Sequence, residues 1–132
     1  MIDIYPFFIL LGVSLLMDAF WLSYRFEYHK TLFLTIQKDS LEINVVPAVL
    51  VYLLIATALY WIIYVVAPPS LQRDPLKAAG TGALMGFFMY GLYDLTNLAT
   101  LKQYTLSMTI IDILWGTFLC GTATGLTTYL LK

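Results

Sequence analysis

The sequence predicts an all-α, polytopic membrane protein in which four transmembrane helices form one bundle. Of its 132 residues, 61% are hydrophobic and only 11% are charged, whereas soluble domains carry roughly 25% charged residues. A soluble core of this length could not bury so much apolar surface. In addition, four segments reach the length of about 20 mostly apolar residues that crossing a bilayer requires. Because backbone groups in lipid must be hydrogen-bonded internally, these segments are expected to be helices.

The four expected spans follow one another along a single domain, residues 1–132. They are predicted at residues 5–24, 41–67, 78–101 and 106–131. The first is expected to remain in place as a span, since it lacks the basic stretch and the cleavage pattern of a signal peptide. The second should end at two consecutive prolines, Pro68 and Pro69.

The connectors between the spans differ in character. Residues 68–77 and 102–105 are short polar turns, whereas residues 25–40 are longer. In that longer connector Phe26, Leu32 and Phe33 fall roughly on one helical face. This pattern favours a short helix lying in the headgroup region of the membrane, and a plain polar loop is an equal alternative.

Three aspartates lie inside the expected spans: Asp18 in the first, Asp94 in the third and Asp112 in the fourth. Counted from the ends of their helices, all three lie roughly 10 Å below the same membrane face, at 1.5 Å per residue. Glu42 and Asn44 should open the second span from that face. Pro47 is expected to kink the second span at a similar depth.

Aromatic and amide side chains accompany these carboxylates. Asp18 precedes Trp21 by three residues and Asp112 precedes Trp115 by three, a spacing that places each pair on one helical face. Tyr90, Asp94 and Asn97 share a face by the same rule. The candidate pocket therefore comprises Asp18, Trp21, Glu42, Asn44, Tyr90, Tyr93, Asp94, Asn97, Asp112 and Trp115.

A buried aspartate costs roughly 2.5–3.5 kcal/mol on insertion scales and should face the bundle interior. Three carboxylates at one level indicate a pocket that binds protons or ions. The structural alternative is that they only hold helices together by hydrogen bonds. Glycine pairs four residues apart, Gly82 with Gly86 and Gly121 with Gly125, are expected to let neighbouring helices approach closely.

The run Tyr93-Asp94-Leu95-Thr96-Asn97-x-Ala99-Thr100 resembles a family of small four-helix membrane proteins, domain of unknown function 2177. Asp112-x-x-Trp115-Gly116 and Asp18-x-x-Trp21-Leu22 belong to the same resemblance, which covers nearly the whole chain. Residues 25–40 match it loosely, and Tyr104 stands where the family usually has tryptophan. The resemblance implies the fold and brings no established activity.

Several functions are disfavoured by composition. The net charge of −1 gives no reason to expect nucleic acid, and one cysteine with one histidine makes a metal site unlikely on ligand count. No catalytic, phosphate-binding or dinucleotide motif occurs, so we expect no cofactor and assign no catalytic residue.

Three function classes remain for this integral, multi-pass membrane protein. The first is proton-coupled transport or cation passage, which requires a homo-oligomer because four helices enclose little of a pore. The second is a protein that binds or modifies lipid, with Trp21, Trp115 and Tyr93 lining a slot. The third is an accessory subunit of a larger membrane complex.

Overall fold

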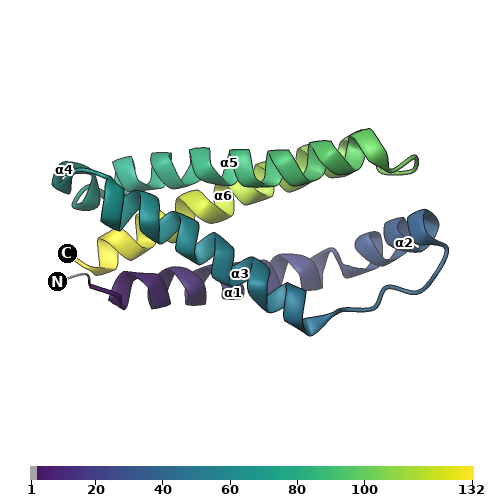
Figure 1. Cartoon of the computed structure of the whole chain (residues 1–132), viewed down its shortest axis with the longest axis horizontal. Coiled ribbons are helices and arrows are strands. Elements are labelled where there is room, and N and C mark those ends of the chain that lie inside the picture. Colours follow the sequence, from purple (N-terminus) through teal and green to yellow (C-terminus); the bar gives the residue numbers. More distant parts are fainter. Residues whose placement is uncertain (1–2) are drawn as a thin grey trace.

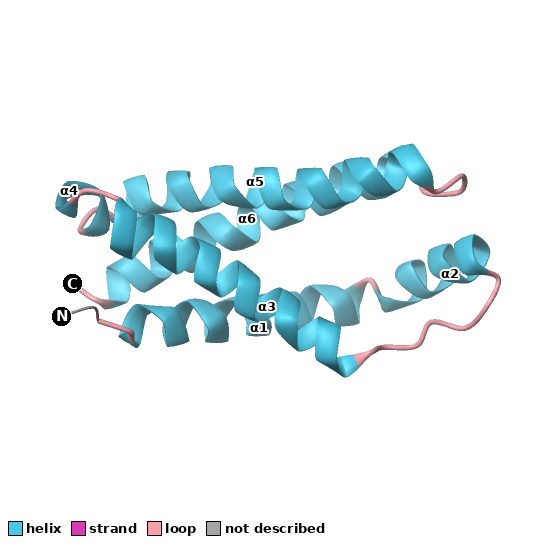
Figure 2. Cartoon of the chain, in the orientation of Figure 1, coloured by secondary structure: helices cyan, strands magenta, loops and turns pink. Residues whose placement is uncertain are grey.

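The protein is built from helices alone in residues 3–132, the part of the chain that the computed structural model describes (Figure 2). In chain order they are α1 (Tyr5–Tyr24), α2 (Phe26–Gln37), α3 (Val45–Tyr60), the π-helical segment η1 (Trp61–Val66), α4 (Pro69–Gln72), α5 (Pro75–Thr100) and α6 (Leu106–Leu130). The long helices run roughly along the long axis of the molecule (Figure 1). Both termini and α4 lie at one end, and α2 lies at the other. The all-α prediction is confirmed.

A single residue separates α1 from α2. Arg25 leaves the helical conformation with φ −99° and ψ 11°, and α2 then runs to a left-handed cap at Lys38 with φ 57°. Of the two alternatives for residues 25–40, the helix is the one that forms. Its side chain Leu32 packs with Tyr104 and Met108 at the turn between α5 and α6, so α2 covers that end of the hairpin.

The second span begins later than the sequence suggested. Residues 40–44 have no regular structure, and α3 begins at Val45. The predicted kink at Pro47 is wrong, because a proline in the first helical turn removes no N–H that the helix uses. At its other end the helix widens into η1, and Ala67 leaves it immediately before Pro68, as expected of a residue that precedes proline.

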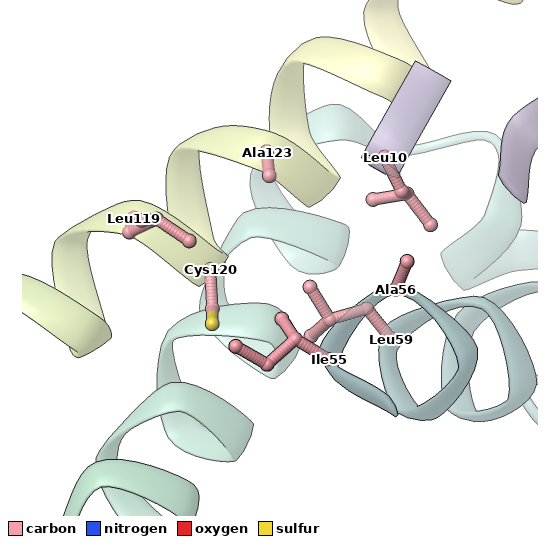
Figure 3. Packing of buried hydrophobic residues seen from close by; sticks show 7 residues of the cluster. All are labelled: Leu10, Ile55, Ala56, Leu59, Leu119, Cys120 and Ala123. Atoms are coloured by element: carbon pink, nitrogen blue, oxygen red, sulfur yellow. The ribbon is translucent and has the colours of Figure 1, made fainter. Parts of the chain in front are cut away.

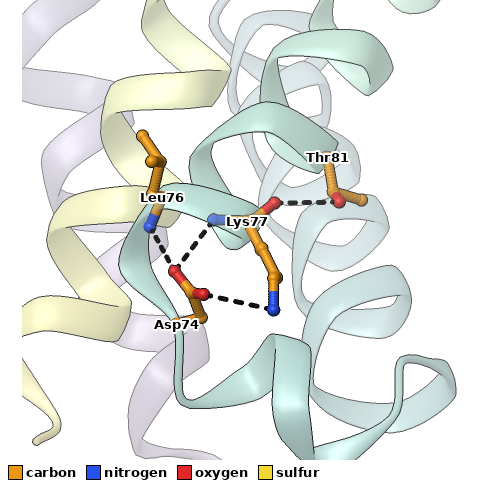
Figure 4. A network of polar contacts seen from close by, with 4 residues as sticks. All are labelled: Asp74, Leu76, Lys77 and Thr81. Atoms are coloured by element: carbon orange, nitrogen blue, oxygen red, sulfur yellow. Dashed lines mark hydrogen bonds and ion pairs between the residues drawn. The ribbon is translucent and has the colours of Figure 1, made fainter.

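The start of α5 is fixed by a capping network (Figure 4). Asp74 Oδ1 accepts hydrogen bonds from the backbone N–H groups of Leu76 at 3.1 Å and Lys77 at 3.2 Å. Lys77 Nζ lies 3.4 Å from Asp74 Oδ2. Pro75 occupies the first helical position, where its missing N–H costs nothing. Because of this cap, α5 begins three residues before the predicted 78.

Helices α5 and α6 pack more closely against each other than any other pair of helices in residues 3–132. A Cβ atom added at Gly86 would overlap the carbonyl oxygen of Gly116, and one at Gly82 would overlap Thr124. Thr124 Oγ1 also donates to the carbonyl of Ala78 at 3.0 Å. The predicted close approach through small residues is therefore confirmed.

The aliphatic core lies where α1, α3 and α6 meet (Figure 3). Its buried members are Leu10, Ile55, Ala56, Leu59, Leu119, Cys120 and Ala123. Cys120 is fully buried and unpaired. Many large apolar side chains remain on the outside, Phe20 and Leu16 among them with exposed fractions of 71% and 76%. Such an outer surface suits lipid and not water.

Three of the long helices are long and apolar enough to cross a membrane: α1, α3 continued by η1, and α6. Helix α5 has 26 residues, more than the other three, but its glycine, threonine and asparagine residues make it less apolar. The protein is therefore a multi-pass helical membrane protein with three spans defined by composition.

We expect Gly86→Ala to destabilise the protein by about 1–3 kcal/mol, because the new methyl group would press on the Gly116 backbone and force α5 away from α6. Gly91→Ala is the matched control on the same helix, since an added Cβ there meets no atom within 4 Å. It should leave stability unchanged or raise it by up to about 1 kcal/mol. Unfolding in detergent, followed by circular dichroism, measures both, and equal losses would contradict the packing.

The cap at Asp74 predicts a dependence of stability on pH. The backbone N–H of Lys77 is the main cause that holds the pKa of the Asp74 carboxyl below its ordinary value of 3.8. A lowered folded-state pKa stabilises the fold above the unfolded-state value and loses that effect as pH falls through the folded-state value. Asp74→Asn keeps an accepting oxygen without the charge. We expect wild type to have a higher Tm than Asp74→Asn at pH 7. The difference in Tm between the two proteins should disappear as pH falls below about 3.8.

Candidate functional site

The carboxylate of Asp18 joins three helices. Tyr52 on α3 donates its hydroxyl to Asp18 Oδ2 at 2.5 Å, and Trp115 on α6 donates Nε1–H to Asp18 Oδ1 at 2.9 Å. Asp18 itself belongs to α1. Both of its oxygens are thus satisfied by neutral donors, the arrangement that a carboxylate removed from water requires.

The two Asp-x-x-Trp motifs pair with each other, but not symmetrically. The indole rings of Trp21 and Trp115 stack with centroids 4.5 Å apart and an interplanar angle of 7°. Trp115 donates to the aspartate of the other motif, Asp18, whereas Trp21 Nε1 is buried without a hydrogen-bond partner among the described residues. The reciprocal bond from Trp21 to Asp112 is not made.

Asp94 is fully buried on α5. Its Oδ1 accepts a hydrogen bond of 2.5 Å from the hydroxyl of Tyr104, which lies between α5 and α6. Burial, and then this bond to the carboxylate, raise the pKa of the Tyr104 hydroxyl above its ordinary value, so the group remains a donor. Asp94 Oδ2 has no partner among the described residues.

Asp112 is the third aspartate of the site. It is half-buried on α6, one turn before the Trp115 that donates to Asp18, and it lies within electrostatic range of Asp94 and Asp18. These three carboxyl groups, from three helices, make up the carboxyl cluster. No ion pair within 4.0 Å involves any of them, since residues 3–132 contain only the surface pairs Lys30–Glu27 and Lys77–Asp74.

Two further predicted residues lie at this cluster. A Cβ at Gly116 would overlap the ring of half-buried Tyr90, so this tyrosine packs directly on α6. Tyr90 is also within electrostatic reach of Asp18 and Asp112. Asn97 is half-buried on the same helix as Asp94.

The remaining three predicted residues lie apart from the cluster. Tyr93 on α5 is 56% exposed, on the outer side of the helix. Glu42 and Asn44 are exposed in the link before α3, and Asn44 makes no capping bond with its side chain. Their exposure follows from the late start of α3, which leaves both residues outside the helix.

Three residues at the site are not among those predicted from the sequence to form it. Tyr52 and Tyr104 supply the hydroxyl groups that bind Asp18 and Asp94. Arg25 places its guanidinium carbon 4.3 Å from the ring centroid of Tyr28 and 5.4 Å from that of Trp21, and its Nε and Nη2 are buried without partners among the described residues. The sequence feature that could have indicated the role of Tyr52 is its position at the same depth as a buried carboxylate.

Metal binding by this cluster finds no support. No group of three or more His, Cys, Asp or Glu side chains in residues 3–132 is arranged to hold a metal ion. The carboxyl groups accept hydrogen bonds from tyrosine and tryptophan instead. Such a set of groups can bind, share and hand over protons.

Fold and site define a multi-pass integral membrane protein that holds carboxyl groups inside its helical bundle. The chain belongs to the family of predicted membrane proteins DUF2177, whose model matches residues 4–129. No curated protein and no solved structure matches it. The resemblance drawn from the motifs is thereby confirmed, and the family description names no activity.

We expect Tyr52→Phe to lower the free energy of unfolding by about 1.5–3 kcal/mol, because it removes a hydrogen bond to a charged group and leaves Asp18 Oδ2 unsatisfied. Tyr93→Phe is the matched control, since that hydroxyl makes no hydrogen bond within residues 3–132 and the ring is exposed. Thermal unfolding in detergent compares the two. Similar losses in both variants would show that the Tyr52 bond contributes nothing.

Proposed function

We propose that this protein binds protons at the cluster of Asp18, Asp94 and Asp112 and passes them across part of the membrane. The observation that supports the proposal is that Asp112 lies within electrostatic range of both Asp94 and Asp18, and that none of the three has a cationic partner within 4.0 Å among the described residues. Like charges inside a bundle repel unless a proton or cation is shared. Ionisable residues within spans most often belong to ion or proton pathways.

Protons fit the cluster better than metal ions. The carboxyl oxygens of Asp18 are occupied by O–H and N–H donors, which a metal ion would have to displace. A pair of adjacent carboxyl groups such as Asp94 and Asp112 needs only one shared proton to lose its repulsion. When Asp112 is ionised, the unpaired guanidinium of Arg25 provides a nearby counter-charge.

The cluster has an outlet toward the end of the bundle that carries α2. His29 on α2 lies within electrostatic reach of Asp94, and its Nδ1 is 3.0 Å from the carbonyl oxygen of Arg25. A route from Asp18 through Asp112 and Asp94 to His29 uses groups that each accept and release protons.

The membrane arrangement follows from the same packing. We infer that α5 is a fourth span, because it packs along α6 and could not leave the bilayer without exposing the α6 glycines. We place α2 at the headgroup level, where its Glu27, Lys30 and Lys38 face water. Four helices enclose no pore, so passage across the whole membrane calls for a homo-oligomer. The outer face of α5 and α6 that carries the exposed side chains of Leu76, Leu114 and Phe118 is the candidate contact.

Binding of a lipid chain is the second candidate function. An apolar slot of about 260 Å³ between α1 and α3 is lined by Leu11, Leu15, Val49 and Leu53 together with Tyr52. Tyr52 donates to Asp18, so a chain in this slot would end close to the carboxylate. Trp21 and Trp115, which the sequence suggested as its lining, do not line this slot.

Proton passage is tested in liposomes with a pH-sensitive dye inside. We expect wild-type protein to dissipate a pH gradient and Asp112→Asn to slow this at least tenfold, because the amide cannot take up a proton. Asp94→Asn should have a similar effect. Asp39→Asn, at an exposed position in the link before α3, is the control and should retain wild-type flux.

Two results would decide against proton passage. One is a wild-type flux no faster than that of empty liposomes, and the other is a normal flux in both Asp112→Asn and Asp94→Asn. If, in addition, lipid co-purifies with wild type and is lost when Val49→Trp fills the slot, the lipid-binding function is favoured instead.

A further inference from the structure

A polar cavity lies at the end of the bundle opposite α2, where both termini and α4 gather (Figure 1). It has a volume of about 390 Å³, and its polar lining comes from Asp3, Tyr60, Tyr64, Gln72 and Arg73. A volume of this size is typical of small-molecule sites. None of these residues belongs to the carboxyl cluster.

The wall of the cavity is held in place by hydrogen bonds around η1. Tyr60 donates its hydroxyl to the Asp3 carbonyl at 2.8 Å, and the hydroxyls of Tyr64 and Thr128 are 2.8 Å apart. Gln72 Nε2 donates to the carbonyl of Ala67 at 2.8 Å, where the helix ends. Helical segments of the π type often occur at functional sites, and here one is braced by specific side chains.

The two tyrosine rings form one side of the cavity. Their centroids are 6.0 Å apart and the rings are inclined by 29°. Because both hydroxyls are engaged in hydrogen bonds, the rings are fixed and present their faces and edges to the cavity. Aromatic faces attract an alkylammonium group.

The cavity carries one charge of each sign, and these charges do not neutralise each other. Arg73 forms no ion pair within residues 3–132. Asp3 uses Oδ1 to accept a hydrogen bond from the backbone N–H of Tyr5 at 3.0 Å, and its second oxygen takes no part in that bond. A ligand with a phosphate and an ammonium group would complement both charges.

The position of the cavity relative to the membrane indicates that such a ligand is a lipid. Helix α1 begins at Tyr5 and η1 ends at Val66, so the cavity lies where spanning helices reach the headgroup level. The large side chains of Ile4, Tyr5, Val66 and Leu130 beside it are exposed and suit contact with acyl chains. Pro6, Val65 and Leu131 complete an apolar wall.

We propose that this cavity binds the headgroup of a zwitterionic phospholipid. Arg73 binds the phosphate through its planar fork of N–H groups. Asp3 accepts a hydrogen bond from the ammonium group, which lies against Tyr60 and Tyr64. The site is separate from the proton-binding cluster, and equilibrium binding tests it without any measurement of flux.

The experiment uses the whole chain in a neutral detergent and isothermal titration with short-chain lipids. Dihexanoyl phosphatidylethanolamine is compared with dihexanoyl phosphatidylglycerol, which lacks the ammonium group, and with free phosphoethanolamine, which lacks the acyl chains. Arg73→Gln and Asp3→Asn are tested at exposed positions where the fold tolerates substitution. Lys77→Gln, which removes the same charge from the same end of the bundle, is the control.

We expect saturable binding of phosphatidylethanolamine that Arg73→Gln weakens about tenfold or more, since it loses charge-assisted hydrogen bonds, while Lys77→Gln leaves it unchanged. Asp3→Asn should weaken phosphatidylethanolamine and leave phosphatidylglycerol as it was. The proposal is overturned if phosphatidylglycerol binds wild type as tightly as phosphatidylethanolamine, if Arg73→Gln and Lys77→Gln behave alike, or if the free headgroup binds as well as the lipid.

Discussion

A carboxylate inside a membrane-spanning helix must find its hydrogen-bond donors within the protein, and this requirement governs the arrangement of the bundle. Asp18 meets it with one donor from α3 and one from α6. Three helices are thus held in one relative orientation by a single side chain. Leu10, about two turns before Asp18 on α1, packs against α3 and α6 in the aliphatic core. Polar and apolar contacts specify the same helix orientation.

Helices α5 and α6 meet by a different principle. Hydrophobic burial gives little net attraction between helices in lipid, so close van der Waals contact and interhelical hydrogen bonds must hold them together. Gly82, Gly86 and Gly116 remove the side chains that would keep the backbones apart. The resulting hairpin brings Asp94 and Asp112 within electrostatic range of each other.

Much of this arrangement was accessible from sequence. Helical period predicted that Asp18 shares a face with Trp21 and Asp112 with Trp115, and depth counted from the helix ends predicted that the aspartates lie in one layer. Periodicity contains no information on which donor meets which acceptor across helices, so the exchange between Trp115 and Asp18 and the role of Tyr52 could not be derived. The position of α3 was missed for another reason: residues 41–44 are polar or branched and compatible with either state, and only the path of the chain from α2 decides it.

The two halves of the bundle differ in a way that bears on how protons could cross it. The aliphatic core of Leu10, Leu59 and Leu119 lies between Asp18 and the end that carries the termini. The proton passage proposed above would therefore require a second conformation. The α5–α6 hairpin resists rearrangement because its contact involves backbone atoms, whereas α1 and α3 rest on it through side chains. Movement would then separate Trp115 from Asp18 and leave Tyr104 with Asp94, since the latter pair belongs to the hairpin. Asp18 would then lose one of its two hydrogen-bond donors.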